Sequence, residues 1–158
     1  MKTSQSNLNK EKEQFVAYLE QNGLRKTRER LAIFDCILSV NGHFTTDDLH
    51  QKLEDKKFHV SKSTLYYTIE ILLNAGLIVG HQFNSLAVLY ETKKRAMNHH
   101  HVICTSCGAV KEVARDTVSM EYAKKITKFT QEYSLIYIYG LCSRCKFRQL
   151  QEKKQKKQ

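Results

Sequence analysis

The sequence predicts an α+β protein in two parts, an N-terminal winged helix-turn-helix domain followed by a small α/β domain. Three observations support this fold class. Apolar residues recur at helical spacing in several segments before Gly76. Two short apolar-rich runs follow, and Asn84-Ser85 separates them as the turn of a β-hairpin would. Two C-x-x-C pairs then lie in the remaining part of the chain.

Composition limits the class of protein. With 158 residues the chain has room for one domain or two small ones, and 41% apolar residues can bury a core. A net charge of +10 and a pI of about 9.4 favour a polyanionic partner, nucleic acid above all. No apolar run approaches the ~18 residues of a membrane span, and the N-terminus lacks a signal peptide's apolar segment. We therefore expect a cytoplasmic protein without a membrane partner.

Cap residues and apolar spacing predict the helices in order. Residues 1–10 are polar and expected to be loose, and a helix over 11–21 ends before Gly23. Thr27 is the expected N-cap of a helix to about Val40. The inward-facing residues of this helix and the next two are predicted to be Leu31, Phe34, Ile37, Leu38, Leu49, Leu53, Leu65, Ile69, Leu72 and Leu73. The helix that follows the one after Thr27 is capped by Thr45 or Thr46 and ends near Lys56. The last helix of this part runs from Ser61 or Ser63 to Gly76.

Strands at 77–82 and 87–91 complete a winged helix-turn-helix, in which the helix after Ser61 would enter the major groove of DNA. Its candidate contacts are Lys62, Ser63, Thr64, Tyr66 and Tyr67. The alternative makes the tyrosines ordinary half-buried core residues. Leu65 and Ile69 already fill the inward face, which favours a contact role for Tyr66, and for Tyr67 both alternatives stay open. The basic cluster Arg25, Lys26, Arg28 and Arg30 offers further contacts to phosphates or the minor groove.

Four cysteines form two knuckles, Cys104/Cys107 and Cys142/Cys145. Disulfides or a thioredoxin-like redox centre are the alternatives, but a redox motif needs one C-x-x-C and here there are two. Four thiolates match a closed, tetrahedral structural Zn²⁺ site. Cys36 lies among apolar residues and is expected in the core.

The predicted boundaries are a DNA-binding domain at 1–92, a hinge at 93–96, a dimerisation and metal-binding domain at 97–150, and a basic tail at 151–158. The second domain should contain strands at 100–104, 109–113 and 134–140, the last of them buried, and a helix from Thr117 or Ser119 to about Gln131 or Tyr133. A unit this small exposes a sheet edge, so we expect a homodimer. From Lys146 onward the chain is lysine-rich and expected to be a solvated or disordered tail.

The winged helix followed by H-H-H-x-I-C-x-x-C-G and Y-x-Y-G-x-C-x-x-C resembles the ferric uptake regulator family of metal-dependent repressors, from about Gly23 to Cys145. The resemblance implies structural zinc on the four knuckle cysteines, and a DNA operator as partner. It makes Tyr66 the base-reading tyrosine and Arg25 the minor-groove residue. It places a regulatory metal site on His43, Glu91, His99, His101 and Glu112.

Three imidazoles and two carboxylates form a nitrogen and oxygen donor set that fits Fe²⁺, Mn²⁺ or Zn²⁺. His99 and His101 alternate along a strand and should share a face, with His100 on the other. Zinc-sensing relatives carry Cys at the position of Glu91 and peroxide sensors carry Asp, so the resemblance favours Fe²⁺, with Zn²⁺ or Mn²⁺ able to substitute. The hypothesis is that one ion ties both halves together, and that the dimer then binds an inverted repeat.

Two departures from the family pattern matter. Many members carry Arg where this chain has Tyr67, and the ligands of a third metal site are replaced by Asn98, His100, Ser119 and Ser134, so no third site is expected. Alternatives remain: a zinc- or peroxide-sensing relative, a constitutive DNA-binding or zinc-buffering protein, or an enzyme using Glu91 or Glu112 as base. Five protein ligands would crowd out a substrate, so we predict neither catalysis nor a small-molecule substrate.

Overall fold

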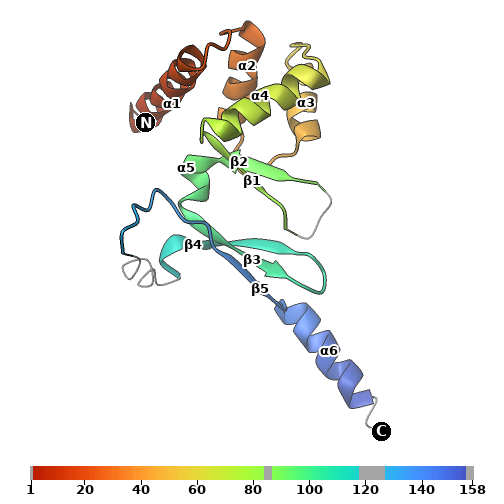
Figure 1. Cartoon of the computed structure of the whole chain (residues 1–158). Coiled ribbons are helices and arrows are strands. Elements are labelled where there is room, and N and C mark those ends of the chain that lie inside the picture. Colours follow the sequence, from red (N-terminus) through yellow and green to blue (C-terminus); the bar gives the residue numbers. More distant parts are fainter. Residues whose placement is uncertain (1, 84–86, 118–126, 156–158) are drawn as a thin grey trace. The chain divides into compact units, whose positions relative to one another are not determined.

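The computed structural model describes residues 2–83, 87–117 and 127–155 (Figure 1). The chain divides into two compact units. The first comprises Met1–His81 and Ala87–Lys94, and the second comprises Gln82–Leu86 and Arg95–Gln158. Within the described ranges no helix is both long and apolar enough to cross a lipid bilayer.

The first unit contains four helices and a two-stranded wing among its described residues (Figure 1). The elements are α1 (Lys2–Gln21), α2 (Arg28–Leu38), α3 (Thr46–Asp55), α4 (Lys62–Asn74), β1 (Ile78–His81) and β2 (Leu89–Thr92). The prediction that residues 1–10 are loose is wrong for residues 2–10, which belong to α1. The turn predicted at Asn84-Ser85 lies outside the described residues.

Side-chain caps fix where the helices begin, as the sequence predicts. Thr27 accepts a hydrogen bond from the backbone N–H of Arg30, and Ser61 caps α4 in the same way. At α3, Thr45 and Asp48 form a capping box, and the hydroxyl and N–H of Thr45 lower the pKa of the Asp48 carboxyl. The caps therefore set the first turn of α4, which carries the predicted DNA contacts.

The apolar faces of these helices form one core in the first unit. The phenyl rings of Phe15 and Phe34 pack with centroids 5.0 Å apart, so α1 joins the core directly. Cys36 is buried there, as predicted. Leu73 was predicted to face inward but is exposed, and Ile71 is buried instead. The buried face of α4 is thus rotated slightly from the face that the spacing of its apolar residues predicts.

The wing is tied to the helical part by a short β-bridge. Strands β1 and β2 pair antiparallel, with Gly80 opposite Tyr90. Phe44 and Tyr90 exchange both backbone hydrogen bonds, at 2.9 and 2.8 Å, which adds the segment after α2 to the other edge of β2. This bridge places His43 beside Glu91 in the backbone register.

The second unit contains a three-stranded sheet with β3 in the centre (Figure 1). Its elements are β3 (His99–Cys104), β4 (Val110–Ala114), a 3-10 helix (Arg115–Thr117), β5 (Tyr137–Gly140) and α6 (Ser143–Gln155), and α5 (Lys93–Ala96) lies where the chain passes from the first unit to the second. Strand β4 pairs antiparallel with β3, and β5 pairs parallel with it.

Three predictions for the second unit need correction. The lysine-rich stretch from Lys146 is helical to Gln155, because Lys, Arg, Gln, Glu and Leu all favour helix. Residues 127–136 contain no regular element, so the predicted helix does not reach Gln131, and its earlier part lies outside the described residues. The predicted buried strand is shorter, and Ile138 and Tyr139 in it are exposed.

Candidate functional site

The four knuckle cysteines lie together within the second unit. Cys104 ends β3, Cys107 follows in the turn, and Cys142 and Cys145 lie at the start of α6. Their sulfurs are all within 4.8 Å of one another, and those of Cys107 and Cys142 are 3.9 Å apart. Tetrahedral Zn–S bonds of about 2.3 Å put sulfurs about 3.8 Å apart, so the cluster fits a Zn²⁺ ion.

The protonation chemistry of the cluster also favours a metal. None of the five cysteines, all of them described, forms a disulfide. Backbone N–H groups of Cys142 and Cys107 lower the pKa of Cys104 to about 6, so this sulfur is a thiolate at neutral pH. The Ser106 hydroxyl lowers the pKa of Cys145, but the neighbouring sulfurs and burial outweigh it and raise that pKa to about 11. A divalent cation would displace the remaining protons.

In the first unit, two imidazoles converge on one carboxylate. Nε2 of His43 lies 3.2 Å from Oε1 of Glu91, and Nε2 of His81 lies 2.8 Å from the same oxygen. The side chains of His81 and Glu91 are fully buried, and the rings of His43 and His81 meet edge to face at 5.4 Å. His43 and Glu91 are ligands predicted from the sequence, and His81 is not among the predicted residues.

The signal for His81 lies in the strand register. Val79 is directly opposite Glu91 in the β1–β2 pair. Residues two apart on a strand share a face, so His81 lies on the face of Val79 and Glu91. The position of His81 on the same face as Glu91 follows from the pairing of Val79 with Glu91. This pairing cannot be read from the sequence without the register of the hairpin.

In the second unit, His99 and His101 share one face of β3, as predicted. Their Nε2 atoms are 3.0 Å apart. Glu112 on β4 is directly opposite His101, and its Oε1 lies 4.0 Å from Nε2 of His99. Both oxygens of Glu112 accept hydrogen bonds from the Arg95 guanidinium, at 2.6 and 2.8 Å. Glu112 is therefore near the imidazoles but already bound to a cation.

The surroundings of His101 and His99 hold these rings in place. His101 stacks on Tyr137 with centroids 5.8 Å apart, and Phe83 contacts it at 4.9 Å. Nδ1 of His99 is 3.0 Å from the carbonyl oxygen of Arg95, which leaves Nε2 as the nitrogen directed toward His101. Hydrogen bonding at one ring nitrogen to orient the other is typical of metal-binding histidines.

His100 lies on the opposite face of β3, and its Nε2 is 3.0 Å from the carbonyl oxygen of Arg115. Of the four positions at which the family's third site would fall, Asn98 is exposed and Ser134 lies in an irregular segment. Ser119 lies outside the described residues. The absence of a third metal site stays a prediction.

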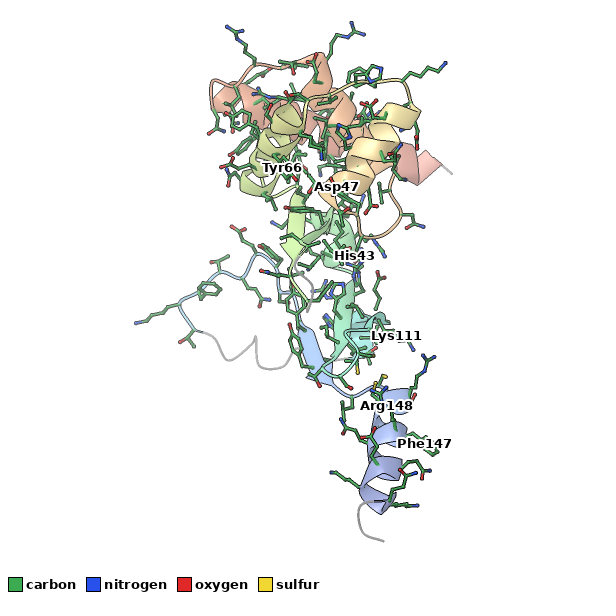
Figure 2. The ribbon with its side chains drawn as sticks, turned by 90° about the vertical axis from the view of Figure 1, so that its right-hand side faces the viewer. His43, Asp47, Tyr66, Lys111, Phe147 and Arg148 are labelled. Atoms are coloured by element: carbon green, nitrogen blue, oxygen red, sulfur yellow. The ribbon has the colours of Figure 1, made fainter. Side chains whose placement is uncertain are left out.

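The start of α4 presents the predicted DNA contacts to solvent. Tyr66 and Tyr67 are 53% and 47% exposed, so neither is enclosed in the core. Tyr66 is labelled on α4 in Figure 2. Lys62 and Ser63 are exposed and Thr64 is half-buried. A surface hollow between the starts of α2 and α4 is lined by Thr27, Glu29, Arg30, His59, Val60, Ser61, Ser63, Thr64 and Tyr67.

Arg25 and Arg30 lie beside this surface. Arg25 is exposed, and the guanidinium of Arg30 donates a hydrogen bond to the carbonyl oxygen of Arg25. The same guanidinium lies over the Tyr67 ring, 5.4 Å from its centroid. Tyr67 stands where many family members carry arginine. Its ring holds the guanidinium of Arg30, from α2, at the edge of α4.

Comparison with known proteins gives a match to one family of regulators. A family model described as the ferric uptake regulator family matches residues 21–139. The peroxide-responsive repressor PerR of Staphylococcus epidermidis is 27% identical over 149 residues, covering 92% of this chain and 97% of that protein. A PerR of Staphylococcus aureus is 26% identical over 137 residues, covering 85% and 91%.

Solved structures share the fold. The ferric uptake regulator from Pseudomonas aeruginosa with manganese has a TM-score of 0.68 at 22% identity, covering 80% of this chain and 96% of that one. The Helicobacter pylori ferric uptake regulator has a TM-score of 0.65 at 20% identity, covering 88% and 93%. Because the family model also spans most of the sequence, this chain belongs to the ferric uptake regulator family of metal-responsive, DNA-binding transcriptional regulators.

Proposed function

We propose that the protein is a repressor of the ferrous-iron type, which binds inverted-repeat operators as a homodimer when its regulatory site holds metal. The ion would be bound by His43 and Glu91 of the first unit and by His99, His101 and Glu112 of the second. The observation that carries this proposal is that each unit presents a preformed pair of donors, at 3.2 Å for His43 and Glu91 and 3.0 Å for His99 and His101.

The donor chemistry supports Fe²⁺, with Mn²⁺ or Zn²⁺ able to substitute. Imidazole and carboxylate ligands accept all three ions, and the set contains no thiolate that would favour a softer metal. When bound, the ion supplies a cross-link between the DNA-binding and dimerising halves. The chain's own contribution is to hold the imidazoles oriented and largely removed from water.

DNA would be read by the start of α4. Tyr66 is the proposed base-reading residue, and Lys62, Ser63, Thr64 and Tyr67 surround it on the same turns. Arg25 is proposed to enter the minor groove, which attracts basic side chains. The net charge of +10 supplies the nonspecific part of the affinity.

A homodimer would form through the second unit. Strand β5 is an edge strand of its sheet and exposes Ile138 and Tyr139. A strand at the edge of a sheet with large exposed apolar side chains is suited to pack against the same strand of a second copy of the chain. Two copies of α4 could then lie at the spacing of successive major grooves on an inverted repeat.

The test is operator binding by His99→Ala and His101→Ala, on a duplex selected from a random library by metal-loaded wild type. We expect Fe²⁺ or Mn²⁺ to tighten wild-type binding and to have little effect on either variant, with zinc content unchanged. A thousandfold effect corresponds to about 4 kcal/mol of coupling between metal and DNA. His59→Ala, outside the donor sets but in the lining of the hollow beside α4, is the control for the metal response alone, taken as the ratio of operator affinities with and without metal. Unchanged metal dependence in both variants would refute the switch.

A second candidate is peroxide sensing, favoured by the similarity to PerR proteins. His43, His99 and His101 would hold the Fe²⁺, which would supply the redox chemistry for cleaving hydrogen peroxide. A ligand imidazole would then gain one oxygen atom from the peroxide, and the other oxygen would leave as water. Peptide mass spectrometry after peroxide treatment of the Fe²⁺-loaded and Mn²⁺-loaded protein separates the two functions. An added oxygen on His43, His99 or His101 in the iron sample alone, with loss of operator binding, would favour the peroxide sensor.

A further inference from the structure

Glu91 lies at the centre of a donor set that belongs to the first unit alone. Its Oε1 is 2.8 Å from Nε2 of His81 and 3.2 Å from Nε2 of His43. The ligand atoms of all three residues lie within 4.8 Å of one another. Two of the side chains are fully buried and that of His43 is 17% exposed, so three polar groups meet where little water can solvate them.

These separations fit coordination to one ion. For metal–nitrogen and metal–oxygen bonds of about 2.1 Å, neighbouring ligands of an octahedron lie about 3.0 Å apart. The observed 2.8 and 3.2 Å lie on either side of that value. Two Nε2 atoms converge on one carboxylate oxygen, an arrangement that an ion between them or two hydrogen bonds to its two lone pairs would both give. Two histidines and one carboxylate with open positions are a set that binds Fe²⁺ in other proteins.

The backbone of the first unit holds the three donors without help from the second. The Phe44–Tyr90 bridge fixes His43 beside Glu91, and the β1–β2 register fixes His81 on the same face as Glu91. Phe44 is buried, and its ring lies 5.9 Å from that of Tyr90. The arrangement is therefore preorganised, which lowers the entropic cost of binding an ion.

We propose that His81 is a ligand of the regulatory metal, so that His43, His81 and Glu91 form a three-donor site for a divalent first-row cation within the DNA-binding unit. The proposal rests on the proposed function for the roles of His43 and Glu91, and adds a ligand to them. The first unit would hold the ion through three bonds, and His99 and His101 would complete its coordination. The metal would thus remain with the DNA-reading half when the second unit releases it.

The test compares His81→Gln with wild type in the full chain, with zinc bound to the cysteines and Co²⁺ as probe. Glutamine can still donate a hydrogen bond to Glu91 but is a poor ligand. We expect the number of imidazoles around Co²⁺, measured by X-ray absorption, to fall by one, with a shift of the visible bands and a 10- to 100-fold weaker dissociation constant. His59→Gln should match wild type. His81→Asn repeats the test if glutamine disturbs the wing packing.

An unchanged imidazole count and visible spectrum in both His81 variants would overturn the proposal and leave His81 as a hydrogen-bond partner of Glu91. Operator binding of the wild type, measured on the same samples with and without Co²⁺, separates this outcome from failure of the proposed function. If wild-type DNA binding responds to metal while the His81 variants keep the full imidazole count, the switch stands and the extra ligand does not.

Discussion

The cysteine cluster and the imidazole–carboxylate sets are built in opposite ways. All four sulfurs come from the second unit, joined by the return of the chain from β5 to α6 beside the end of β3. The imidazoles and carboxylates that we propose as ligands are divided between the units, three in the first and three in the second. A site contained in one unit stabilises that unit's fold, whereas donors divided between two units can couple ion binding to their arrangement.

The strongest test of this difference removes one sulfur. Cys142→Ser should lose zinc and unfold the sheet of the second unit, because zinc binding contributes on the order of 10 kcal/mol to small domains built on such sites. The measurement is metal content together with hydrogen exchange of the β3 amides. Cys36→Ala, at a buried thiol of the first unit, should keep its zinc. Retained zinc and β3 protection in Cys142→Ser would mean that three sulfurs suffice.

Chelation should separate the two kinds of site in the wild type. A brief treatment with EDTA should strip the ion from the imidazole–carboxylate donors and abolish metal-dependent operator binding, while one zinc per chain remains. The closed S₄ shell should exchange slowly, whereas the proposed N/O ligands include the 37% exposed Glu112 and should release their ion faster. Metal analysis and fluorescence anisotropy on the same samples provide the measurement. Simultaneous loss of zinc and operator binding would contradict this distinction.

Glu91→Gln tests the carboxylate at the centre of the first set. The amide keeps the side-chain volume but removes the anionic oxygen that faces two imidazoles, so we expect a 10- to 100-fold loss of regulatory metal affinity with unchanged zinc. Isothermal titration with Mn²⁺ measures it. Glu20→Gln, at an exposed glutamate of α1, removes the same charge elsewhere and should bind Mn²⁺ as the wild type does. Equal affinities in the two variants would exclude Glu91 as a ligand.

The sequence identifies those features that depend on local chemistry. Thr27, Thr45 and Ser61 could be recognised as caps because capping involves residues within one turn. The zinc cluster could be recognised because each C-x-x-C pair already brings two sulfurs together, so that two pairs make a complete ligand set. The shared face of His99 and His101 follows from the period of a strand.

The features that the sequence did not reveal depend on contacts between distant residues. His81 reaches Glu91 only through the β1–β2 register, and the Phe44–Tyr90 bridge that brings His43 to the same carboxylate has no local pattern. Helix α6 has the high charge of a disordered tail, and the helix propensity of its Lys, Arg, Gln, Glu and Leu residues prevails over that charge. Composition also could not reveal that β5 is an edge strand or that its Ile138 and Tyr139 are exposed.

The two N/O sets themselves differ in what occupies their carboxylates. Glu91 faces imidazoles and is buried, whereas Glu112 is 37% exposed and bound by Arg95 through both oxygens. An ion approaching His99 and His101 must compete with a guanidinium for Glu112. The donors of the second unit are therefore expected to bind metal more weakly than those of the first. The ion pair of Arg95 with Glu112 determines the size of this difference in affinity.

Arg95→Gln removes that competition. Because partly exposed ion pairs contribute about 0.2–1 kcal/mol, we expect regulatory metal to bind up to about fivefold more tightly. Lys111→Gln is the matched control, since Lys111 precedes Glu112 on β4, is exposed and removes the same charge (Figure 2). Mn²⁺ titration of both variants distinguishes local release of Glu112 from a general change in electrostatic potential. If both bind more tightly to the same extent, net charge is the cause. If Arg95→Gln binds more weakly, the arginine positions Glu112 for the metal instead of withholding it.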